Sequence, residues 1–427
     1  MTTTKNNEHK KLNFSSEREQ SQACLNSAEH EKNQGRKVLN VPNLRFPEFQ
    51  GEWTTSLLSD YLTENKERNK KGEFDKTDVL SVSGDYGIVN QIELLGRSFA
   101  GASVLPYHVV RHGNIVYTKS PLKEYPYGIV KANTGVDGIV STLYAVYNIK
   151  NNVDAQFIEY YFSLANRTNR YFKPIVRIGA KHDMKIGNQE VLANKVTFPN
   201  LEEQTKIASL FRFLDERIAT QNKIIEDLKM QKSAIIEIEY TPNTKTTSHI
   251  GNVIEQISKR NKNNAIQNVL SVSNRQGFIK QSDQFENRNV ASEDTSNYKI
   301  VEKNDFAFNP ARINVGSIAR LTTFEKGIVS PMYICFRTQE NVAPEYIDFF
   351  FESKHFYCEI QKRLEGSVRQ CLSFEGLCNI PFSLPSLEMQ QRIGKRLFIL
   401  GQKIKTETDL LELLNKQKQY LLRQMFI

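Results

Sequence analysis

The sequence VLSVSGDYGIV at residues 79–89 returns later in the chain as VLSVSNRQGFI at residues 269–279. Each stretch opens with the same β-branched run, which predicts a strand, and Gly87 and Gly277 stand in register after it. A match of this length between distant parts of one chain is the sign of an internal duplication.

Four further matches follow in the same order in both halves of the chain. They are YHVVRHGNIVY (107–117) with YKIVEKNDFAF (298–308), GIVS (138–141) with GIVS (327–330), FIEYYF (157–162) with YIDFFF (346–351), and PNLEEQTKI (199–207) with PSLEMQQRI (385–393). The repeating unit is far longer than the roughly 20–45 residues of a solenoid repeat. We therefore interpret the chain as a tandem duplication of a whole domain together with its trailing segment.

Both copies have the same internal plan. Short runs rich in β-branched and aromatic residues, separated by Gly, Asn, Pro and Asp, predict strands. Residues 157–172 and 346–364 carry apolar side chains at helical spacing and predict helices within the same domain. The fold class that we expect is α+β, with two tandem mixed α/β domains, each followed by a long α-helix. The expected segments are a polar leader at 1–40, domains at 41–200 and 243–385, and helices at 201–242 and 386–427.

The two closing helices have clear signals at their starts. Asn200 and Glu203 have the spacing of a capping box, whereas in the second copy Ser386 can cap but Met389 cannot return the bond. A heptad seam then runs along each helix. Its members are Leu214, Ile218, Gln221, Ile225, Leu228, Lys232 and Ile235, and in the second copy Leu400, Ile404, Glu407, Leu411, Leu414, Lys418 and Leu421.

This seam, with polar residues at the same two places in both copies, predicts a coiled coil between the two helices. The net charges support that pairing, because residues 201–242 carry −2 and residues 386–427 carry +4. The alternative is that each helix is amphipathic and docks only on its own domain.

Composition sets limits on the class of protein. The 427 residues exceed the size of a single core and suggest two or three domains, while the first 40 are too polar to bury a core, so we expect them to be disordered. No apolar run is long enough for a membrane span, and no signal peptide opens the chain. The five cysteines show no C-x-x-C spacing and indicate reduced thiols, so we expect a cytoplasmic protein. The net charge of +9 favours an anionic partner.

Motifs of catalysis are missing. There is no phosphate-binding P-loop, and Asn309-Pro310-Ala311-Arg312 only begins like the N-P-P-aromatic motif of amino-methyltransferases. Asp183-Met184-Lys185 has the D-x-K form of some metal-dependent nucleases but lacks their partner residues, and the seven histidines show no metal-ligand spacing. We therefore expect a non-catalytic chain that holds no cofactor and no metal.

With these features, the chain resembles the specificity subunits of type I restriction-modification systems. The resemblance rests on the duplicated domains, on the P-x-L-x-x-Q-x-[KR]-I stretches before the long helices, on the sequence LRFPEFQGEW at residues 44–53, and on an R-N-K at 68–70 echoed at 260–262. It covers the chain from about residue 41 to the end.

The resemblance implies a role in DNA recognition. In that family each mixed domain reads one half of a bipartite DNA target, and the helices pair antiparallel and set the distance between the half-sites. Two modification subunits, which bind S-adenosylmethionine and methylate adenine, and two motor-nuclease restriction subunits complete the assembly. We therefore expect S-adenosylmethionine, ATP and Mg on partner subunits and none in this chain.

Candidate base-reading side chains lie in two pairs of loops. Cationic and amide groups reach base edges best from loops that a rigid domain holds. The candidates are Lys119, Lys123, Arg177, Lys181, His182 and Lys185 in the first copy, and Arg312, Arg363, Arg369 and Gln370 in the second. For each of them an ordinary solvated surface role is the alternative.

Two other functions stay open at this point. One is a coiled-coil scaffold whose duplicated domains bind proteins, with no role for DNA. The other is a single-chain restriction enzyme, against which the missing catalytic motifs argue.

Overall fold

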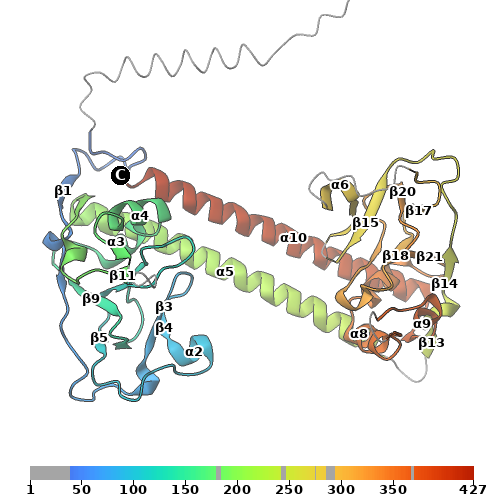
Figure 1. Cartoon of the computed structure of the whole chain (residues 1–427). Helices are drawn as coiled ribbons and strands as arrows, with labels where there is room; N and C mark the ends of the chain where they lie inside the picture. Colours follow the sequence, from blue (N-terminus) through green and yellow to red (C-terminus); the bar gives the residue numbers. More distant parts are fainter. Residues whose placement is uncertain (1–38, 179–183, 242–246, 275, 285–293, 367–369) are drawn as a thin grey trace, which may run out of the picture. The chain divides into compact units, whose positions relative to one another are not determined.

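The computed structural model describes residues 39–178, 184–241, 247–274, 276–284, 294–366 and 370–427. The chain divides into two compact units (Figure 1). Unit 1 comprises residues 1–215 with 416–427, and unit 2 comprises residues 216–415. The division falls within the two long helices, so each unit contains parts of both. The domain boundaries expected from the sequence, which lie at the helix ends, stay a prediction.

Unit 1 holds one four-stranded sheet, a second sheet made of two bridged strand pairs, and the two separate pairs β1-β12 and β10-β11. One sheet has the order β2-β9-β6-β7, and the hairpin β3-β4 and the pair β5-β8 meet through a parallel bridge between Val79 and Ile139. The bounds are β1 Thr54–Leu57, β2 Leu62–Glu64, β3 Leu80–Ser83, β4 Gly87–Asn90, β5 His108–Val110, β6 Ile115–Thr118, β7 Val130–Ala132, β8 Gly138–Val140, β9 Tyr144–Ile149, β10 Arg177–Ile178, β11 Met184–Lys185 and β12 Lys195–Phe198. The helices are η1 Leu58–Asp60, η2 Lys76–Asp78, α2 Gln91–Leu95, α3 Ala155–Tyr161, α4 Ala165–Phe172 and η3 Glu190–Leu192.

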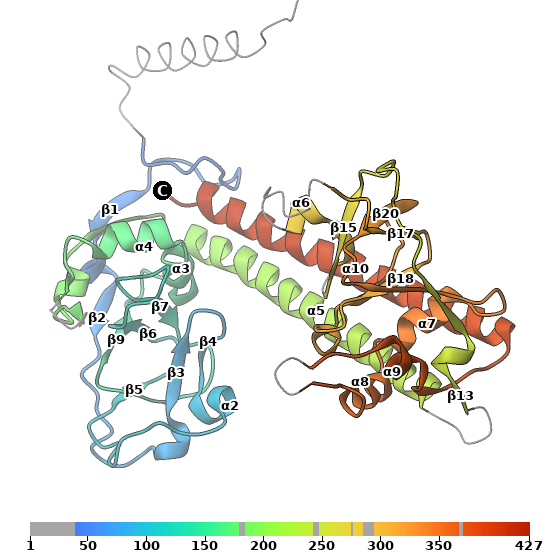
Figure 2. The same ribbon diagram turned by 45° about the vertical axis from the view of Figure 1, so that its right-hand side comes forward.

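Unit 2 repeats this plan except for the pair β10-β11, in whose place its described residues have an isolated bridge between Glu365 and Cys371 (Figure 2). Its sheets have the orders β14-β21-β18-β19 and β16-β15-β20-β17, and β13 pairs with β22 as β1 pairs with β12. The strands are β13 Thr247–His249, β14 Ile254–Ile257, β15 Val269–Ser273, β16 Gly277–Lys280, β17 Lys299–Glu302, β18 Phe306–Phe308, β19 Ile318–Arg320, β20 Lys326–Val329, β21 Ile334–Thr338 and β22 Pro381–Ser383. The helices are η4 Ile250–Asn252, α6 Gln281–Gln284, η5 Ile313–Val315, α7 Pro344–Phe350, α8 Lys354–Gln361 and α9 Phe374–Cys378. The predicted fold class of two tandem mixed domains is confirmed.

Shared glycines explain why the duplicated stretches kept their sequence. Gly87 and Gly277 follow the turns of matching hairpins at φ angles of 73° and 66°, a left-handed conformation that disfavours side chains. At Gly138 an added Cβ would lie 2.5 Å from the Asp78 carbonyl oxygen, and at Gly327 it would lie 2.4 Å from Leu270 Cδ1. Both glycines thus let two strands of the second sheet approach closely.

The two long helices are α5, Leu201–Tyr240, and α10, Leu387–Gln424. The Asn200 Oδ1 accepts a hydrogen bond from the Glu203 amide at 2.9 Å, and the Ser386 Oγ accepts one from the Met389 amide at 3.4 Å. The buried Glu203 carboxylate accepts a bidentate pair of bonds from Arg45 and one from the Trp53 indole. The stretch around residues 44–53 is therefore fastened to the first helix.

A buried glutamine joins each long helix to its own domain. The Gln204 side chain donates to the Pro199 carbonyl and accepts from the Asp154 amide at the start of α3. Gln390 does the same with Pro385 and with the Ala343 amide at the start of α7, so the repeated P-x-L-x-x-Q stretch makes one bonding pattern twice.

The last turns of each long helix belong to the other copy's unit. In unit 1 the ring of Phe426 packs against Phe157 and Phe211, and in unit 2 the ring of Tyr240 packs against Tyr346 and donates a hydrogen bond to its carbonyl oxygen. Each core is thus completed by the end of the helix that follows the other domain.

The seam positions are the sheltered ones on both helices. Ile225, Leu228, Ile235 and Leu414 are buried and the other apolar members are half-buried. Within unit 2 the Gln221 side chain donates to the Glu407 carboxylate at 2.7 Å, and within unit 1 Lys418 pairs with Asp215. A coiled coil along the whole of both helices stays a prediction. Of the helices in the described part of the chain, none is long and apolar enough to cross a membrane.

Candidate nucleic-acid interface

The two lysines proposed for the loop after β6 have different surroundings. The Lys119 ammonium donates to the Asn188 Oδ1 at 2.6 Å, and burial lowers its pKa. Lys123 is exposed in the loop and has no ion pair among the described residues. Lys123 is thus available to a ligand, whereas Lys119 already has a partner within the domain.

Arg177 and Lys185 lie directly across from each other. They are opposite partners in the short antiparallel pair β10-β11, and both side chains are exposed. Directly opposed residues of an antiparallel pair point to the same face. Unit 1 therefore presents two cations side by side at this point. Lys181 and His182 lie outside the described residues, between these two strands.

The candidates in the second copy are also divided. Arg312 is exposed and lies just before η5. Gln370 is also exposed. Arg363 is half-buried, and its guanidinium bonds to the Glu359 carboxylate at 2.5 Å and to the Asn379 carbonyl at 3.0 Å. Its donors are thus used within the domain. Arg369 lies outside the described residues.

A buried histidine that the sequence did not single out lies in the same domain as Lys119. His108 is 2% exposed, and its Nδ1 has no hydrogen-bond partner among the described residues. Burial, with smaller contributions from Arg68 and Lys119, lowers its pKa to about 4. The ring is therefore neutral at pH 7 and adds no charge to the domain.

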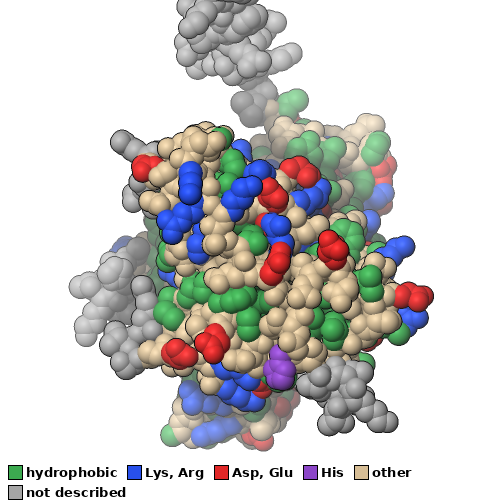
Figure 3. All heavy atoms as spheres, turned by 90° about the vertical axis from the view of Figure 1, so that its right-hand side faces the viewer, with side chains coloured by type: hydrophobic (Ala, Val, Ile, Leu, Met, Phe, Trp, Pro, Cys, Tyr) green, Lys and Arg blue, Asp and Glu red, His purple; other side chains and the backbone are tan. Residues whose placement is uncertain are grey.

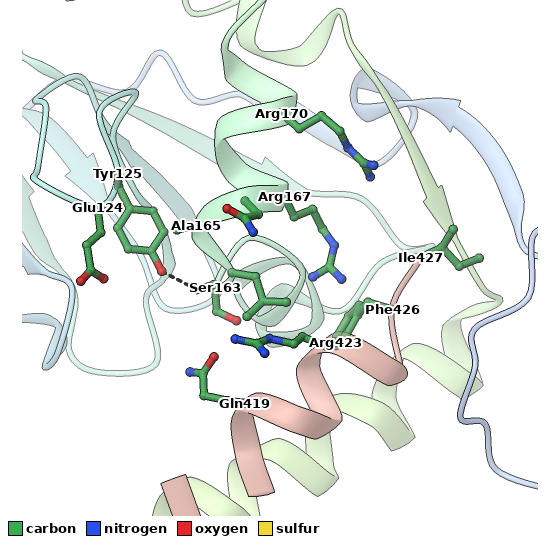
Figure 4. A pocket seen from close by; sticks show the side chains of 12 residues that line it. Glu124, Tyr125, Ser163, Ala165, Arg167, Arg170, Gln419, Arg423, Phe426 and Ile427 are labelled. Carbon is green, nitrogen blue, oxygen red and sulfur yellow. Dashed lines mark hydrogen bonds between the residues drawn. The ribbon is translucent and has the colours of Figure 1, made fainter. Parts of the chain in front are cut away.

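Three arginines line one cavity in unit 1 (Figure 4). Arg167, Arg170 and Arg423 line a space of about 690 Å³ together with Glu124. The Arg167 side chain is buried and bonds to the carbonyl oxygens of Tyr161 and Leu422, and it has no carboxylate partner in the part of the chain that the structure describes. Its pKa is lowered to about 10 by desolvation. Arg167 therefore ties the last turns of α10 to α4.

Within the described ranges no group of three or more His, Cys, Asp and Glu side chains could hold a metal ion. The site residues proposed from the sequence are thus polar and cationic groups on loops and a hairpin. Nothing in their geometry assigns any of them to a base or a phosphate, so their role as DNA contacts stays a prediction.

Comparisons with known proteins agree with this architecture. The family model of the type I restriction modification DNA specificity domain matches residues 236–416. The S subunit of a type I restriction-modification system from M. genitalium is similar in structure, with a TM-score of 0.53 and 14% identity over 91% of this chain and 99% of that one. No curated protein matches the sequence.

Two further solved structures are similar at lower scores. The HsdS subunit from Thermoanaerobacter tengcongensis has a TM-score of 0.44 and 14% identity, covering 88% of this chain and 96% of that one. A structure described as the structural basis of complex assembly and conformational transition of the type I R-M system has a TM-score of 0.48 and 13% identity. The match covers 88% of this chain and 97% of that one.

The family match falls on the second copy, and the first copy has the same order of strands in its two sheets. Residues 236–416 therefore match the family of the type I restriction modification DNA specificity domain, and the chain as a whole has a fold similar to that of the S subunit from M. genitalium.

Proposed function

We propose that this DNA-recognition subunit reads a bipartite target, with one domain for each half-site, and that it serves as the scaffold for the modification and restriction subunits. The observation that carries the proposal is the duplication itself. Two domains with the same strand order differ in the loops that bear exposed cations, such as Lys185 on a hairpin and Arg312 before η5. Two domains with the same sheets but different loops are suited to recognising two different short DNA sequences.

The long helices support the scaffold part of the proposal. α5 has 40 residues and α10 has 38, and each passes without a break from one unit into the other. At 1.5 Å per residue α5 is about 60 Å long. An uninterrupted helix of that length offers partner subunits an extended surface. In this proposal the helices also set the spacing between the half-sites.

Chemistry belongs to the partners in this proposal. The chain carries no phosphate-binding loop and no complete methyltransferase motif. We assign methyl transfer with S-adenosylmethionine to two modification subunits, and ATP- and Mg-dependent translocation and cleavage to two restriction subunits. The purified chain alone should then show no methyl transfer, ATP hydrolysis or DNA cleavage.

The test is a methylation map. The chain is co-expressed with the products of its neighbouring genes, and methylated adenines are located across a host genome for the wild type and two variants. Lys185→Ala should relax the base preference only in one half of the motif, and Arg312→Ala only in the other. Where a bidentate base contact is lost, discrimination should fall by roughly 1–3 kcal/mol.

Lys195→Ala is the matched control in unit 1, because Lys195 is an exposed lysine on β12 away from these loops. It should leave the map unchanged. A motif with no interruption, or an Arg312→Ala variant that alters both halves equally, would contradict the assignment of one domain to each half. A complex without any salt-dependent affinity for duplex DNA would instead favour a scaffold for proteins alone.

A further inference from the structure

Two short loops, one in each unit, share a motif with cationic side chains that do not pack in the interior. Loop A is residues 68–74 in unit 1 and loop B is residues 260–266 in unit 2, and both open with Arg-Asn-Lys. The two loops are fixed to equivalent strands of their units. Arg68 forms a backbone bridge to His108 in β5, and Arg260 forms one to Lys299 in β17.

The central asparagine closes loop A from within. Asn69 is 1% exposed, and its side chain donates to the Phe74 carbonyl at 2.7 Å and accepts from the Phe74 amide at 3.1 Å. The Asn69 amide donates to the Tyr107 carbonyl of the neighbouring segment. The asparagine therefore ties both ends of the loop to each other and to the domain.

Loop B is closed by the same bonds. Asn261 is 0% exposed, and its side chain bonds to the Ile266 carbonyl at 2.9 Å and to the Ile266 amide at 3.1 Å, while its own amide donates to the Tyr298 carbonyl. In each domain, three hydrogen-bonded residues thus form a rigid support at the same place: Asn69, Phe74 and Tyr107 in unit 1, and Asn261, Ile266 and Tyr298 in unit 2. A rigid support lowers the entropy cost of ordering the side chains that it presents.

The flanking lysines form no ion pair with an acidic side chain in the described ranges, and Lys71 has only a weak electrostatic interaction with Glu73. Lys70, Lys71 and Lys262 are exposed, and none has an ion pair among the described residues. Arg68 and Arg260 donate to neutral oxygens, those of Pro106 and Asn297. The acidic side chains near loop A, Glu67 and Glu73, pair instead with Arg111 at 3.0 and 2.8 Å. The charge of loop A is therefore left for a ligand.

A basic hollow lies beside loop B. Lys259, Arg260, Lys262 and Lys326 line a cavity of about 760 Å³. Lys326 forms an ion pair with Glu302 at 2.9 Å, so the charge that the hollow offers a ligand comes from the other three. Figure 3 shows one face of the molecule on the side of unit 2, where Lys and Arg side chains are interspersed with acidic ones. A concave surface with several cations suits a ligand that carries repeated negative charge.

A comparison of the two copies indicates the chemical class of ligand that loops A and B suit. Domains that read different half-sites must differ where they touch bases, whereas the phosphate backbone is the same in both halves. The other shared residues, the glycines and Gln204 with Gln390, have roles in the interior. We propose that loops A and B bind DNA phosphates, one loop in each half of the target, and carry affinity without sequence information. This inference rests on the proposed function.

The test uses the full complex with its partner subunits and two duplexes, one with the mapped target and one with the same bases scrambled. Lys70→Ala/Lys71→Ala should lower the affinity for both duplexes by the same factor. The slope of log K against log salt should become shallower by about 0.9 for each lost phosphate contact, and by about 0.9 for Lys262→Ala alone. The methylation motif should stay unchanged.

Lys173→Ala and Lys395→Ala remove the same charge from exposed positions outside both loops and should leave both slopes unchanged. A loss restricted to the target duplex would overturn the inference, because the loops would then read bases. Unchanged slopes in both loop variants would overturn it as well. If the wild-type complex itself bound neither duplex, the proposed function would fail first, and that result is distinct from the other two.

Discussion

Units 1 and 2 share their frame and differ in charge at matching places, some on the surface, such as Arg170 and Arg423, and some in the interior, such as Glu359. Aligning α4 with α8 places Arg170 opposite Glu359, and aligning the starts of the long helices places Arg423 opposite Glu237. The arginines line a cavity in unit 1, whereas Glu359 pairs with Lys362 and Arg363 and Glu237 accepts a bond from the Lys354 amide at the start of α8. At these two equivalent helix positions, the side chains of the two units therefore carry opposite charges although the fold is the same.

The difference teaches which positions the fold constrains. Where a residue closes a loop, lets strands approach or ties a helix to its domain, both copies keep it, because the alternative leaves buried groups unsatisfied or overpacked. Where a side chain is exposed, most substitutions cost little stability, so the copies diverge. The four predictions that follow test this division, from the largest expected effect to the smallest.

The largest effect should come from the helix ends that complete each core. Phe426→Ala should destabilise unit 1 and Tyr240→Ala unit 2, each by about 3–5 kcal/mol, because a buried aromatic ring is lost. Hydrogen exchange resolved by mass spectrometry should show the loss of protection in the variant's own unit. Equal losses in both units from either variant would mean that the chain unfolds as one body.

The anchoring glutamines should come next. Gln204→Leu leaves the Pro199 carbonyl and the Asp154 amide without their partner, and Gln390→Leu does the same to Pro385 and Ala343. We expect each to cost about 2–3 kcal/mol, from the penalty for buried unsatisfied groups. Denaturant titration of the two variants should give similar midpoint shifts. A shift in only one of them would show that the two joints are not equivalent.

Acidification should destabilise unit 1 more than unit 2 because of His108. The equivalent position in unit 2 holds Lys299. The pKa of His108 is about 4 in the fold against 6.5 for an unperturbed histidine, so the unfolded state takes up the proton first. The stability that the neutral ring contributes is therefore complete above pH 6.5 and is lost as the pH falls towards 4, by about 2 kcal/mol at pH 5.

Exchange measured at pH 7 and pH 5 checks this expectation. His108→Phe keeps an aromatic ring that does not titrate, and should flatten the pH dependence of unit 1 between those values. A variant that loses as much protection on acidification as the wild type would show that other groups are responsible.

The smallest effects should come from the reversed charges. Arg423→Glu removes a cation near Arg167 and Arg170 and should stabilise unit 1 by less than about 1 kcal/mol. Glu237→Arg removes the acceptor of the Lys354 amide and should destabilise unit 2 by about 1 kcal/mol. Thermal unfolding of the two variants should therefore shift in opposite directions. Shifts of the same sign would contradict the reversal of charge that distinguishes the two surfaces.

The sequence predicted the parts of the fold that repeat or follow a period. The duplication, the starts of α5 and α10 and the sheltered face of each helix could all be derived from spacing, because the 3.6-residue period and the capping residues act locally. The exchange of helix ends between units could not, since Phe426 and Tyr240 contact residues that are distant in the chain.

The candidate site was less predictable for a related reason. Lys119 and Arg363 have the residue types of DNA contacts, but Asn188 and Glu359 occupy their donors, and no local pattern indicates those partners. Loops A and B were visible only as a shared tripeptide. Their rigidity depends on side-chain bonds of Asn69 and Asn261 that only coordinates reveal.

The exchanged helix ends also determine the order in which the chain can fold as it is made. Unit 1 needs residues 416–427, which are synthesised after all of unit 2. At about 5–20 residues per second, the ribosome takes roughly 10–40 s to go from residue 215 to residue 416. Throughout that time Phe157 and Phe211 lack the ring of Phe426, and Arg167 lacks the carbonyl of Leu422. The half of the chain that leaves the ribosome first is therefore the half that completes its core last.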